Sequence, residues 1–437
     1  MQQFEIEFEQ KEPLLKKASY ISRLKELSRI DLSFIGKNGR IPLHNVHSFP
    51  AKFPPLLPYT FINELTCENE IVLDPMMGSC TTLIEALRLN RIAYGCDIDP
   101  LTVLLAEAKL NSVEAVDIAS YGKSIVNKAF VNLQKCKAKI EKQMEEYFDG
   151  KTYDFINYWF KKETQLELFS LALQINALKD VHLKNFLKLI FSSIIITKNG
   201  GVSLATDLAH TRPHIANGKS IPSAFEEFNK KLSSIMKSYT PLANRNFKIF
   251  RTLAQHIPIE DGSVDLIITS PPYANNAIDY LRAHKFSLVW FDYSLDDISN
   301  IRKEFIGSNS VIKDNSIPLP KDCLKIIDEV KSVDSKKGES LGVYYTEMAD
   351  VIEEMYRTIK KNKAAIIVVA TSIIKGIDSQ THKCLAEIGV QKGFKLIGIN
   401  ERQLDRDRRM MPTRWKRDET SQIESRMHEE YVIIFQK

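Results

Sequence analysis

The sequence predicts a doubly wound α/β fold that carries a large, mainly helical insertion. Around residues 71–110, and again from about residue 247 onward, short apolar runs alternate with segments of helical spacing. Such alternation is typical of a parallel sheet covered by helices on both faces. Between these regions, residues 113–245 have helical spacing almost throughout. We therefore expect one sheet whose two halves are separated by the insertion.

The first part of the chain leads into the sheet through a proline-rich stretch. Residues 1–40 are polar and irregular, and prolines recur over His44–Pro58. Because proline lacks an N–H donor and disfavours helix in the residue before it, we expect no regular helix before about Tyr59. A short helix is then expected over Tyr59–Leu65.

The first strand–turn–helix unit follows directly. Ile71–Leu73 is a short apolar run that ends at Asp74, and a turn containing Gly78 comes next. A helix, a strand and a second helix are then expected over Thr81–Leu89, Arg91–Cys96 and Leu101–Leu110. Doubly wound sheets begin with this order of elements.

The insertion and the second half of the sheet differ in their periodicity. Long helical stretches are expected over Asp117–Tyr147, Glu163–Leu178 and His182–Thr197. The second half alternates strands and helices over Val264–Ile268, Tyr344–Lys360, Ala364–Val369, Thr381–Lys392, Phe394–Ile399 and Tyr431–Phe435. The chain is therefore divided into the first half of the sheet with its N-terminal arm, the insertion, and the second half, over residues 1–112, 113–245 and 246–437.

Length, charge and cysteine content narrow the class of protein. The formal net charge of +5 over 437 residues is compatible with a polyanionic partner but too small to argue for one. The six cysteines form no C-x-x-C pair and the nine histidines show no ligand spacing, so neither a disulfide framework nor a metal site is expected. The charged N-terminus does not resemble a signal peptide, and no apolar run approaches the roughly 20 residues of a membrane span. We expect a cytoplasmic protein.

The first candidate site is Asp74–Thr82, DPMMGSCTT, between the first strand and helix. A turn in this place brings backbone N–H groups close to a ligand, and Gly78 allows close approach because it has no side chain. Asp97, after the second strand, is placed to accept hydrogen bonds from ribose hydroxyls, with Asp99 as a near alternative. The segment has neither a G-x-G-x-x-G pattern nor a phosphate-binding lysine. A nucleoside carrying a charged amino acid fits better, with Asp74 facing its ammonium group; an ordinary strand–helix turn is the other interpretation.

The second candidate site is Thr269–Tyr273, TSPPY, directly after a predicted buried strand. Two consecutive prolines remove two N–H donors and leave carbonyl oxygens as acceptors. Ser270 Oγ and the Pro271 carbonyl can therefore accept the two hydrogens of a planar amino group, while Tyr273 stacks on its ring. An ordinary strand-ending turn is the alternative, which the preceding strand and the upstream motif disfavour.

Together these segments resemble the DNA amino methyltransferases, enzymes that methylate exocyclic nitrogens of adenine or cytosine. The family's cofactor motif reads like D-P-F-x-G-S-G-T-T, its catalytic motif is [D/N/S]-P-P-Y, and HNVHSFPAKFPP at residues 44–55 looks like its third cofactor element. The resemblance implies a Rossmann-like methyltransferase sheet and S-adenosylmethionine as cofactor. The cofactor-binding residues that it implies are Phe53, Asp74, Pro75, Gly78, Ser79, Thr81, Thr82, Asp97 and Asp99. The catalytic residues that it implies are Ser270, Pro271, Pro272 and Tyr273.

The resemblance also bears on the reaction and its partners. The cofactor motif precedes the catalytic motif, as in family members with a large insertion between the two halves. Ser270 at the first catalytic position favours N4 of cytosine over N6 of adenine, which more often goes with aspartate or asparagine. The expected protein is a monomeric, site-specific methyltransferase that acts on a flipped cytosine in double-stranded DNA, with a cognate restriction endonuclease as a candidate partner. An N6-adenine enzyme, an RNA base methyltransferase and a non-catalytic nucleic-acid-binding module remain alternatives.

Two positions depart from the family pattern. Cys80 replaces the usual third small residue of the glycine motif. Phe250–Thr252, before the catalytic strand, lacks the acid that in the family often faces the cofactor adenine. The sequence therefore assigns no residue to the adenine.

Several segments are candidates for holding nucleic acid. Glu401–Glu419 is rich in basic residues, and its candidates for phosphate contacts are Arg406, Arg408, Arg409, Arg414, Lys416 and Arg417. A solvated loop with internal ion pairs is the alternative for this segment. Four residues after the catalytic motif either line a base pocket or begin the next helix: Asn275, Asn276, Asp279 and Tyr280. For target recognition we consider the helical insertion and, as a rival, Asp292–Lys337.

Overall fold

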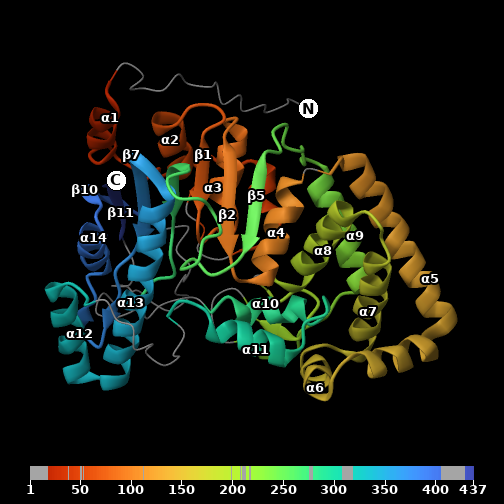
Figure 1. The fold of residues 1–437 in the computed structure, drawn as a ribbon. Helices are drawn as coiled ribbons and strands as arrows, with labels where there is room; N and C mark the ends of the chain where they lie inside the picture. Colours follow the sequence, from red (N-terminus) through yellow and green to blue (C-terminus); the bar gives the residue numbers. More distant parts are fainter. Residues whose placement is uncertain are drawn as a thin grey trace.

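The protein is built around a seven-stranded sheet in the order β10-β11-β7-β6-β1-β2-β5 (Figure 1). The computed structural model describes residues 18–37, 39–49, 52, 54–111, 113–197, 199–206, 208, 213–215, 218–274, 279–307, 318–404 and 429–437. The strands of the sheet are β1 (Ile71–Asp74), β2 (Ile92–Asp97), β5 (Phe247–Arg251), β6 (Val264–Thr269), β7 (Ile359–Val369), β10 (Lys395–Gln403) and β11 (Glu429–Gln436). β11 pairs antiparallel with β7 and β10, and the other neighbouring pairs are parallel.

Helices cover both faces of this sheet. The helices outside the insertion between α4 and β5 are α1 (Tyr20–Leu27), α2 (Leu56–Leu65), α3 (Thr81–Arg88), α4 (Pro100–Leu110), α10 (Leu281–Leu288), α11 (Leu295–Lys303), α12 (Lys321–Val333), α13 (Ser335–Thr358) and α14 (Thr381–Gln391). Within the described ranges, no helix combines the length and the apolar character of a membrane span.

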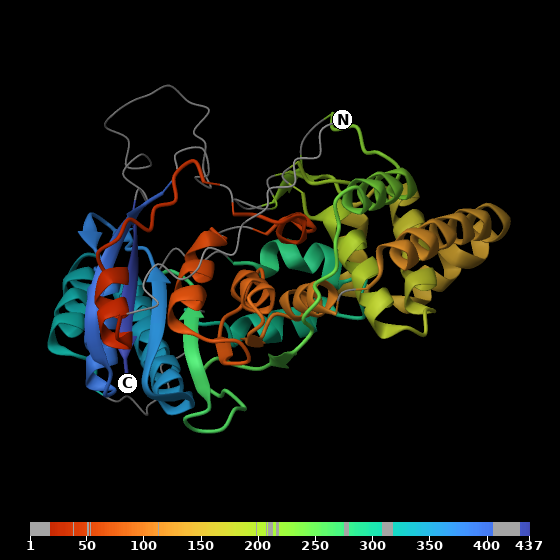
Figure 2. The same cartoon turned by 90° about the horizontal axis from the view of Figure 1, so that it is seen from above.

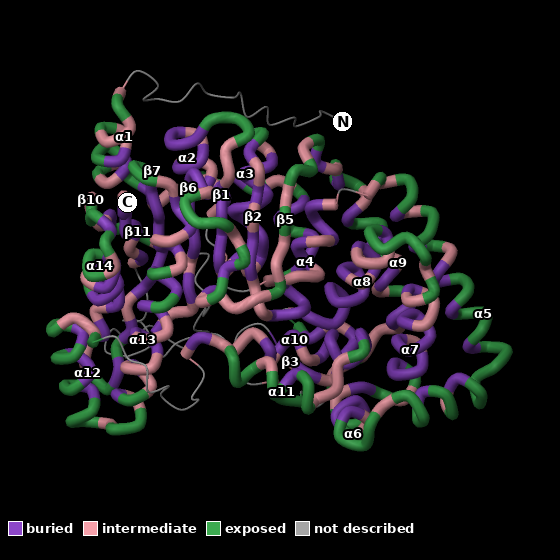
Figure 3. Tube along the Cα trace, in the orientation of Figure 1, coloured by how far each residue is buried: buried purple, intermediate pink, exposed green. Residues whose placement is uncertain are grey.

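The central strands are buried on both faces, as their continuous apolar runs predict. All six residues of β6 are buried. Leu266 and Ile268 pack into a hydrophobic cluster that includes residues of α2, α3 and α4, whereas Ile267 packs into a second cluster with residues of α13 and α14. Figure 3 shows this buried centre between more exposed helices. The predicted doubly wound, Rossmann-like sheet is therefore confirmed.

α2 begins earlier than the sequence predicts. It starts at Leu56 rather than Tyr59, with Pro55 at its N-cap and Pro58 in its first turn. The first N–H groups of a helix have no acceptor within the helix, so proline is tolerated there. The prolines thus mark the start of α2 instead of preventing it.

α13 also begins well before its predicted start at Tyr344. Asp334 caps the helix by accepting a hydrogen bond from the backbone N–H of Lys337 at 3.1 Å. Such a cap satisfies a donor that the helix cannot satisfy itself.

The predicted insertion between α4 and β5 is helical. It contains α5 (Ala115–Tyr147), α6 (Gly150–Trp159), α7 (Lys162–Asn176), α8 (Val181–Ile195) and α9 (Ala224–Met236), with a short hairpin of β3 (Ala205–Thr206) and β4 (His214–Ile215). The sequence predicts a helical insertion and the separate helices α5, α7 and α8, but it gives no bounds for α6 and α9. These helices lie beyond β5 on one side of the molecule (Figure 2). Because α8 packs against α4 within one hydrophobic cluster, the insertion shares its core with the sheet. The division at residues 112 and 245 stays a prediction.

Replacing Phe186 of α8 by alanine tests this shared core. The side chain is fully buried, and its ring contacts that of Tyr239 edge-on with the centroids 5.0 Å apart. Phe186→Ala should lower the free energy of unfolding by about 3–5 kcal/mol, because it leaves a cavity. Phe130→Ala, at a half-exposed phenylalanine of α5, should cost about 1 kcal/mol or less. Urea denaturation measures both, and equal effects would contradict the burial of Phe186 in this core.

Candidate active site

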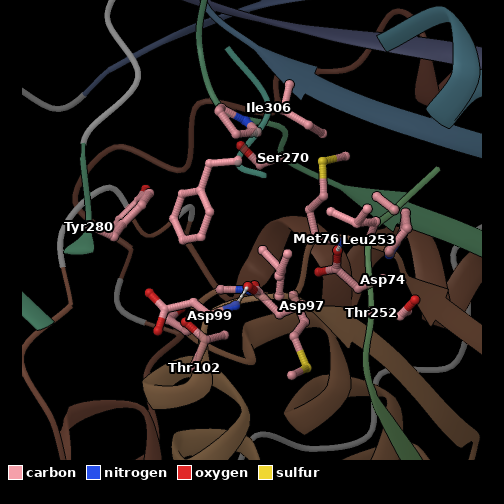
Figure 4. A pocket seen from close by; sticks show the side chains of 18 of the residues that line it. Asp74, Met76, Asp97, Asp99, Thr102, Thr252, Leu253, Ser270, Tyr280 and Ile306 are labelled. Carbon is pink, nitrogen blue, oxygen red and sulfur yellow. Dashed lines mark hydrogen bonds between the residues drawn. The ribbon is translucent and has the colours of Figure 1, made fainter. Parts of the chain in front are cut away.

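The site lies where the winding of the sheet reverses, between β1 and β6. From β1 the chain proceeds to β2 on one side, whereas β6 and β7 lie on the other side. Crossovers on opposite faces leave a crevice at the carboxyl ends of the two strands, where ligands of such sheets bind. A pocket of about 900 Å³, partly open to solvent, lies there (Figure 4).

The pocket brings together most of the predicted cofactor and catalytic residues. The predicted residues that line it are Asp74, Pro75, Gly78, Ser79, Thr81, Asp97, Asp99, Ser270 and Pro272. Thr82, Pro271 and Tyr273 are not among its lining residues. Other predicted site residues lie outside the described residues, namely Phe53, Asn275, Asn276, Arg406, Arg408, Arg409, Arg414, Lys416 and Arg417.

Asp74 ends β1 and is held by its own turn. Its Oδ1 accepts a hydrogen bond from the backbone N–H of Met76 at 3.2 Å, and its Oδ2 accepts one from Thr82 Oγ1 at 2.8 Å. Burial raises the pKa of Asp74 to about 6, because a charged carboxylate is poorly solvated there. Thr82 therefore fixes the orientation of Asp74 instead of lining the pocket.

The glycine turn after β1 explains both the motif and its departure from the family pattern. Gly78 has a φ of +44°, and a Cβ atom at this position would lie 3.5 Å from Cε1 of Phe49. Cys80 is also left-handed, with φ +70°, which accounts for glycine at this position in the family pattern. Its side chain is fully buried, so it fills core space. Lys109 Nζ donates to the carbonyl of Ser79 at 2.9 Å and so supports the turn from below.

Asp97, at the end of β2, lies in the pocket and is oriented by backbone groups. Its Oδ2 accepts a hydrogen bond from the N–H of Gly78 at 3.1 Å, and its Oδ1 accepts one from the N–H of Asp99 at 3.0 Å. Burial, and then the nearby Asp99 carboxylate, raise the pKa of Asp97 to about 7. Asp99 has other partners: it caps α4 through Leu101 N–H at 2.9 Å, and its Oδ2 lies 2.6 Å from Nδ1 of buried His284. Asp97 therefore has the freer carboxylate of the two.

An aromatic wall and a buried amine complete one side of the pocket. The rings of Phe49 and Tyr280 stack with centroids 5.1 Å apart. Tyr280 lines this pocket and directly precedes the first residue of α10, and its part in a base pocket stays a prediction. Lys52 Nζ donates to the carbonyls of His44 and His47 at 2.8 and 3.1 Å, and burial lowers its pKa to about 6. No role for Phe49 or Lys52 was predicted from the sequence, although both belong to the proline-rich stretch.

The SPPY segment follows β6 and faces the cofactor motif across the crevice. Ser270 and Pro272 line the pocket, as Figure 4 shows for Ser270 above Asp97. Tyr273 donates from its hydroxyl to Glu430 Oε1 of β11 at 2.7 Å, and burial holds its pKa well above the ordinary value. Glu430 Oε2 in turn accepts from Arg402 Nη1 at 2.6 Å. This chain of contacts fixes the tyrosine ring beside Ser270.

The loop after β5 closes the pocket next to Asp97. The backbone N–H of Thr252 donates to the carbonyl of Asp97 at 3.2 Å. Thr252, Leu253 and Ala254 line the pocket, and so does Gln255. This loop carries no carboxylate into the pocket, in agreement with the departure seen in the sequence.

Comparison with known proteins agrees with this geometry. A family model described as DNA methylase matches residues 4–108. The chain is 26% identical to type II methyltransferase M.MvaI of Kocuria varians over 395 residues, which cover 82% of this chain and 83% of that protein. It is 22% identical to type II methyltransferase M.MjaII of Methanocaldococcus jannaschii over 350 residues, which cover 61% and 66%. A shorter match, 28% identical over 158 residues, is to type II methyltransferase M.AvaI of Anabaena variabilis and covers 32% and 33%.

Proposed function

Because the chain belongs to the S-adenosylmethionine-dependent DNA amino methyltransferases, we propose that it methylates the exocyclic N4 of cytosine in double-stranded DNA. The family includes both N4-cytosine and N6-adenine enzymes, so the choice of base is the new step. It rests on one observation, which is that Ser270 occupies the first position of the catalytic motif and lines the pocket.

The residues of the pocket fit S-adenosylmethionine. This cofactor supplies an electrophilic methyl group, and it combines an amino acid, a ribose and an adenine. We assign Asp74 to the ammonium group of the cofactor and Asp97 to its ribose hydroxyls. The amino-acid moiety of the cofactor is assigned to the turn at Gly78. Lys52 is assigned to the carboxylate of the cofactor. A bound carboxylate would raise the lowered pKa of Lys52 again, so that its amine takes up a proton and becomes a cationic partner. The pocket thus presents opposite charges to a zwitterionic ligand.

The chain's own groups activate the amine by positioning it. The N4 amine of cytosine is conjugated with its ring and is a weak nucleophile. Acceptance of its two hydrogens by Ser270 Oγ and the Pro271 carbonyl draws the nitrogen toward tetrahedral geometry as the reaction proceeds. The flipped base leaves the duplex stack, and Tyr273 stacks on it instead. Because Glu430 already holds the tyrosine hydroxyl, the ring needs little reorganisation when the base arrives.

The proposed function also includes a partner enzyme and a mode of DNA binding. The relatives named above are type II methyltransferases, so we place this enzyme in a restriction–modification pair with a cognate endonuclease. A monomeric state, a cytoplasmic location, and phosphate contacts by the arginines of residues 401–419 stay predictions of the sequence. The helical insertion and residues 292–337 stay rival candidates for target recognition.

Product analysis tests the choice of base. The purified protein is incubated with S-adenosylmethionine and mixed-sequence duplex DNA, which is then digested to nucleosides for mass spectrometry. N4-methylcytosine is the expected product. N6-methyladenine would keep the family and contradict the argument from Ser270, and methylation of RNA alone would contradict the DNA substrate.

Ser270→Ala tests the role of the serine as an acceptor. Loss of one hydrogen bond that forms fully only in the transition state should lower kcat by about 100-fold. Cofactor affinity, measured by calorimetry, should change by less than about threefold, because Asp74 and Asp97 remain. Ser263→Ala, in the turn before β6, is the matched control and should leave both values unchanged. Loss of cofactor binding by Ser270→Ala would contradict the assigned role.

The pH dependence of cofactor binding tests the two buried carboxyls. The pKa of Asp97 is raised to about 7 and that of Asp74 to about 6, so each takes up a proton as the pH falls through its value. Protonated forms accept hydrogen bonds weakly and do not balance an ammonium group. The Kd for S-adenosylmethionine should therefore rise several-fold from about pH 8 to about pH 6.5. Below that range Lys52, whose pKa is lowered to about 6, gains a proton and strengthens its contact with the cofactor carboxylate, which opposes the effect. Asp97→Asn should remove the upper part of this profile, and exposed Asp31→Asn should not. A flat wild-type profile would contradict the assignment.

A further inference from the structure

The stretch that carries Phe49 is tied to the insertion by a buried histidine. His47 is 1% exposed, and its Nε2 lies 2.8 Å from Oγ of Ser192 in α8. Burial holds the pKa of His47 well below its ordinary value, so the ring is neutral and only one of its nitrogens carries a hydrogen. This contact joins two elements that lie 145 residues apart in sequence.

The hydroxyl of Ser192 determines which nitrogen of His47 carries that hydrogen. Ser192 Oγ donates its single hydrogen to Ser287 Oγ of α10 at 2.8 Å. It has no second hydrogen for His47 and therefore accepts one from Nε2–H. Nδ1 is then the bare nitrogen, and this atom has no hydrogen-bond partner among the described residues. Ser192 thus makes two hydrogen bonds, and both lead out of its own helix.

The neighbouring serine of α8 has no such external partners. Ser193 is also buried, but its hydroxyl donates to the carbonyl of Ile190, three residues earlier in the same helix, at 2.7 Å. Most residues around these two serines are buried and apolar. A hydroxyl in such surroundings needs a partner, because water does not solvate it. Ser193 finds its partner within α8, whereas Ser192 depends on His47 and Ser287.

Both partners of Ser192 belong to segments that form the aromatic wall. His47 precedes Phe49 by two residues. Ser287 follows Tyr280 by seven residues, about two helical turns, so the two lie on the same face of α10. Phe49 and Tyr280 stack on each other and line the pocket. One hydroxyl of the insertion therefore holds the two segments whose rings meet at the pocket.

We propose that Ser192 is a positioning residue for the cofactor pocket, through which the insertion takes part in binding S-adenosylmethionine. Ser192 does not line the pocket itself. Its two hydrogen bonds fix the segments of Phe49 and Tyr280 relative to each other before the ligand arrives. A wall that is already in place loses less conformational freedom on binding, which favours affinity. This inference rests on the proposed placement of the cofactor.

Calorimetry with S-adenosylhomocysteine tests this role without DNA or turnover. Ser192→Ala should raise the Kd about fivefold or more, because His47 Nε2–H loses its acceptor. Ser192→Cys keeps the space filled but supplies only a weak hydrogen-bonding group, so it should also raise the Kd. Ser193→Ala is the matched control: it removes a buried hydroxyl whose bond stays within α8, and it should leave the Kd unchanged. Thermal melting verifies that each variant is folded.

A double-mutant cycle with Phe49 separates positioning from a general loss of stability. Because Ser192 acts through the wall, Ser192→Ala should change the Kd by less than about twofold once Phe49→Leu has removed the ring. An undiminished effect in the Phe49→Leu background would overturn the inference, and so would equal Kd values for wild type and Ser192→Ala. An effect of Ser192→Ala without one of Ser192→Cys would assign the change to packing and overturn the role of the hydrogen bonds.

The wild-type protein separates failure of this inference from failure of the proposed function. If wild type binds S-adenosylhomocysteine and only the Ser192 variants behave otherwise than expected, the cofactor site stands and the role of Ser192 is overturned. If wild type does not bind S-adenosylhomocysteine at all, the proposed function is overturned and this inference with it.

Discussion

The reversal of strand order between β1 and β6 is the constraint on which the site depends. Because the chain leaves β1 toward one side and β6 toward the other, their carboxyl ends open into a common crevice. Asp74 is the last residue of β1 and Ser270 directly follows β6, so the two residues face each other across this crevice. The cofactor residues and the catalytic residues, which lie almost 200 residues apart in sequence, meet because of this topology alone.

Polar groups around the pocket are fixed before any ligand binds. Asp97 is held by two backbone N–H groups, Asp74 by a backbone N–H and a threonine hydroxyl, and Tyr273 by Glu430. Burying carboxylates costs free energy, which their raised pKa values reflect. Because these groups are already oriented in a site of low dielectric constant, they do not have to reorganise during the reaction, which lowers its barrier.

Residues tied to a strand end could be predicted from the sequence, and residues tied to tertiary contacts could not. Asp74, Asp97 and Ser270 each come directly after an apolar run, and carboxyl ends of parallel strands meet at one edge. Ser192, by contrast, lies in an apolar stretch of the insertion that carries no motif. The anchor of Tyr273 is Glu430 on antiparallel β11, and no spacing in the sequence relates the two.

The insertion supports the site although it joins the sheet at the amino ends of the strands, opposite the pocket. α4 runs from the pocket back toward these amino ends, and β5 starts there. The helices between α4 and β5 therefore leave the carboxyl ends of the strands free. α8 nevertheless reaches the cofactor side: Ser192 Oγ lies 2.8 Å from His47 Nε2 and donates to Ser287 Oγ of α10 at 2.8 Å. His47 belongs to the stretch that carries Phe49 and Lys52, and α10 follows Tyr280. One buried polar network thus links the insertion to both sides of the aromatic wall, which explains how a large insertion can be accommodated while the pocket keeps its shape.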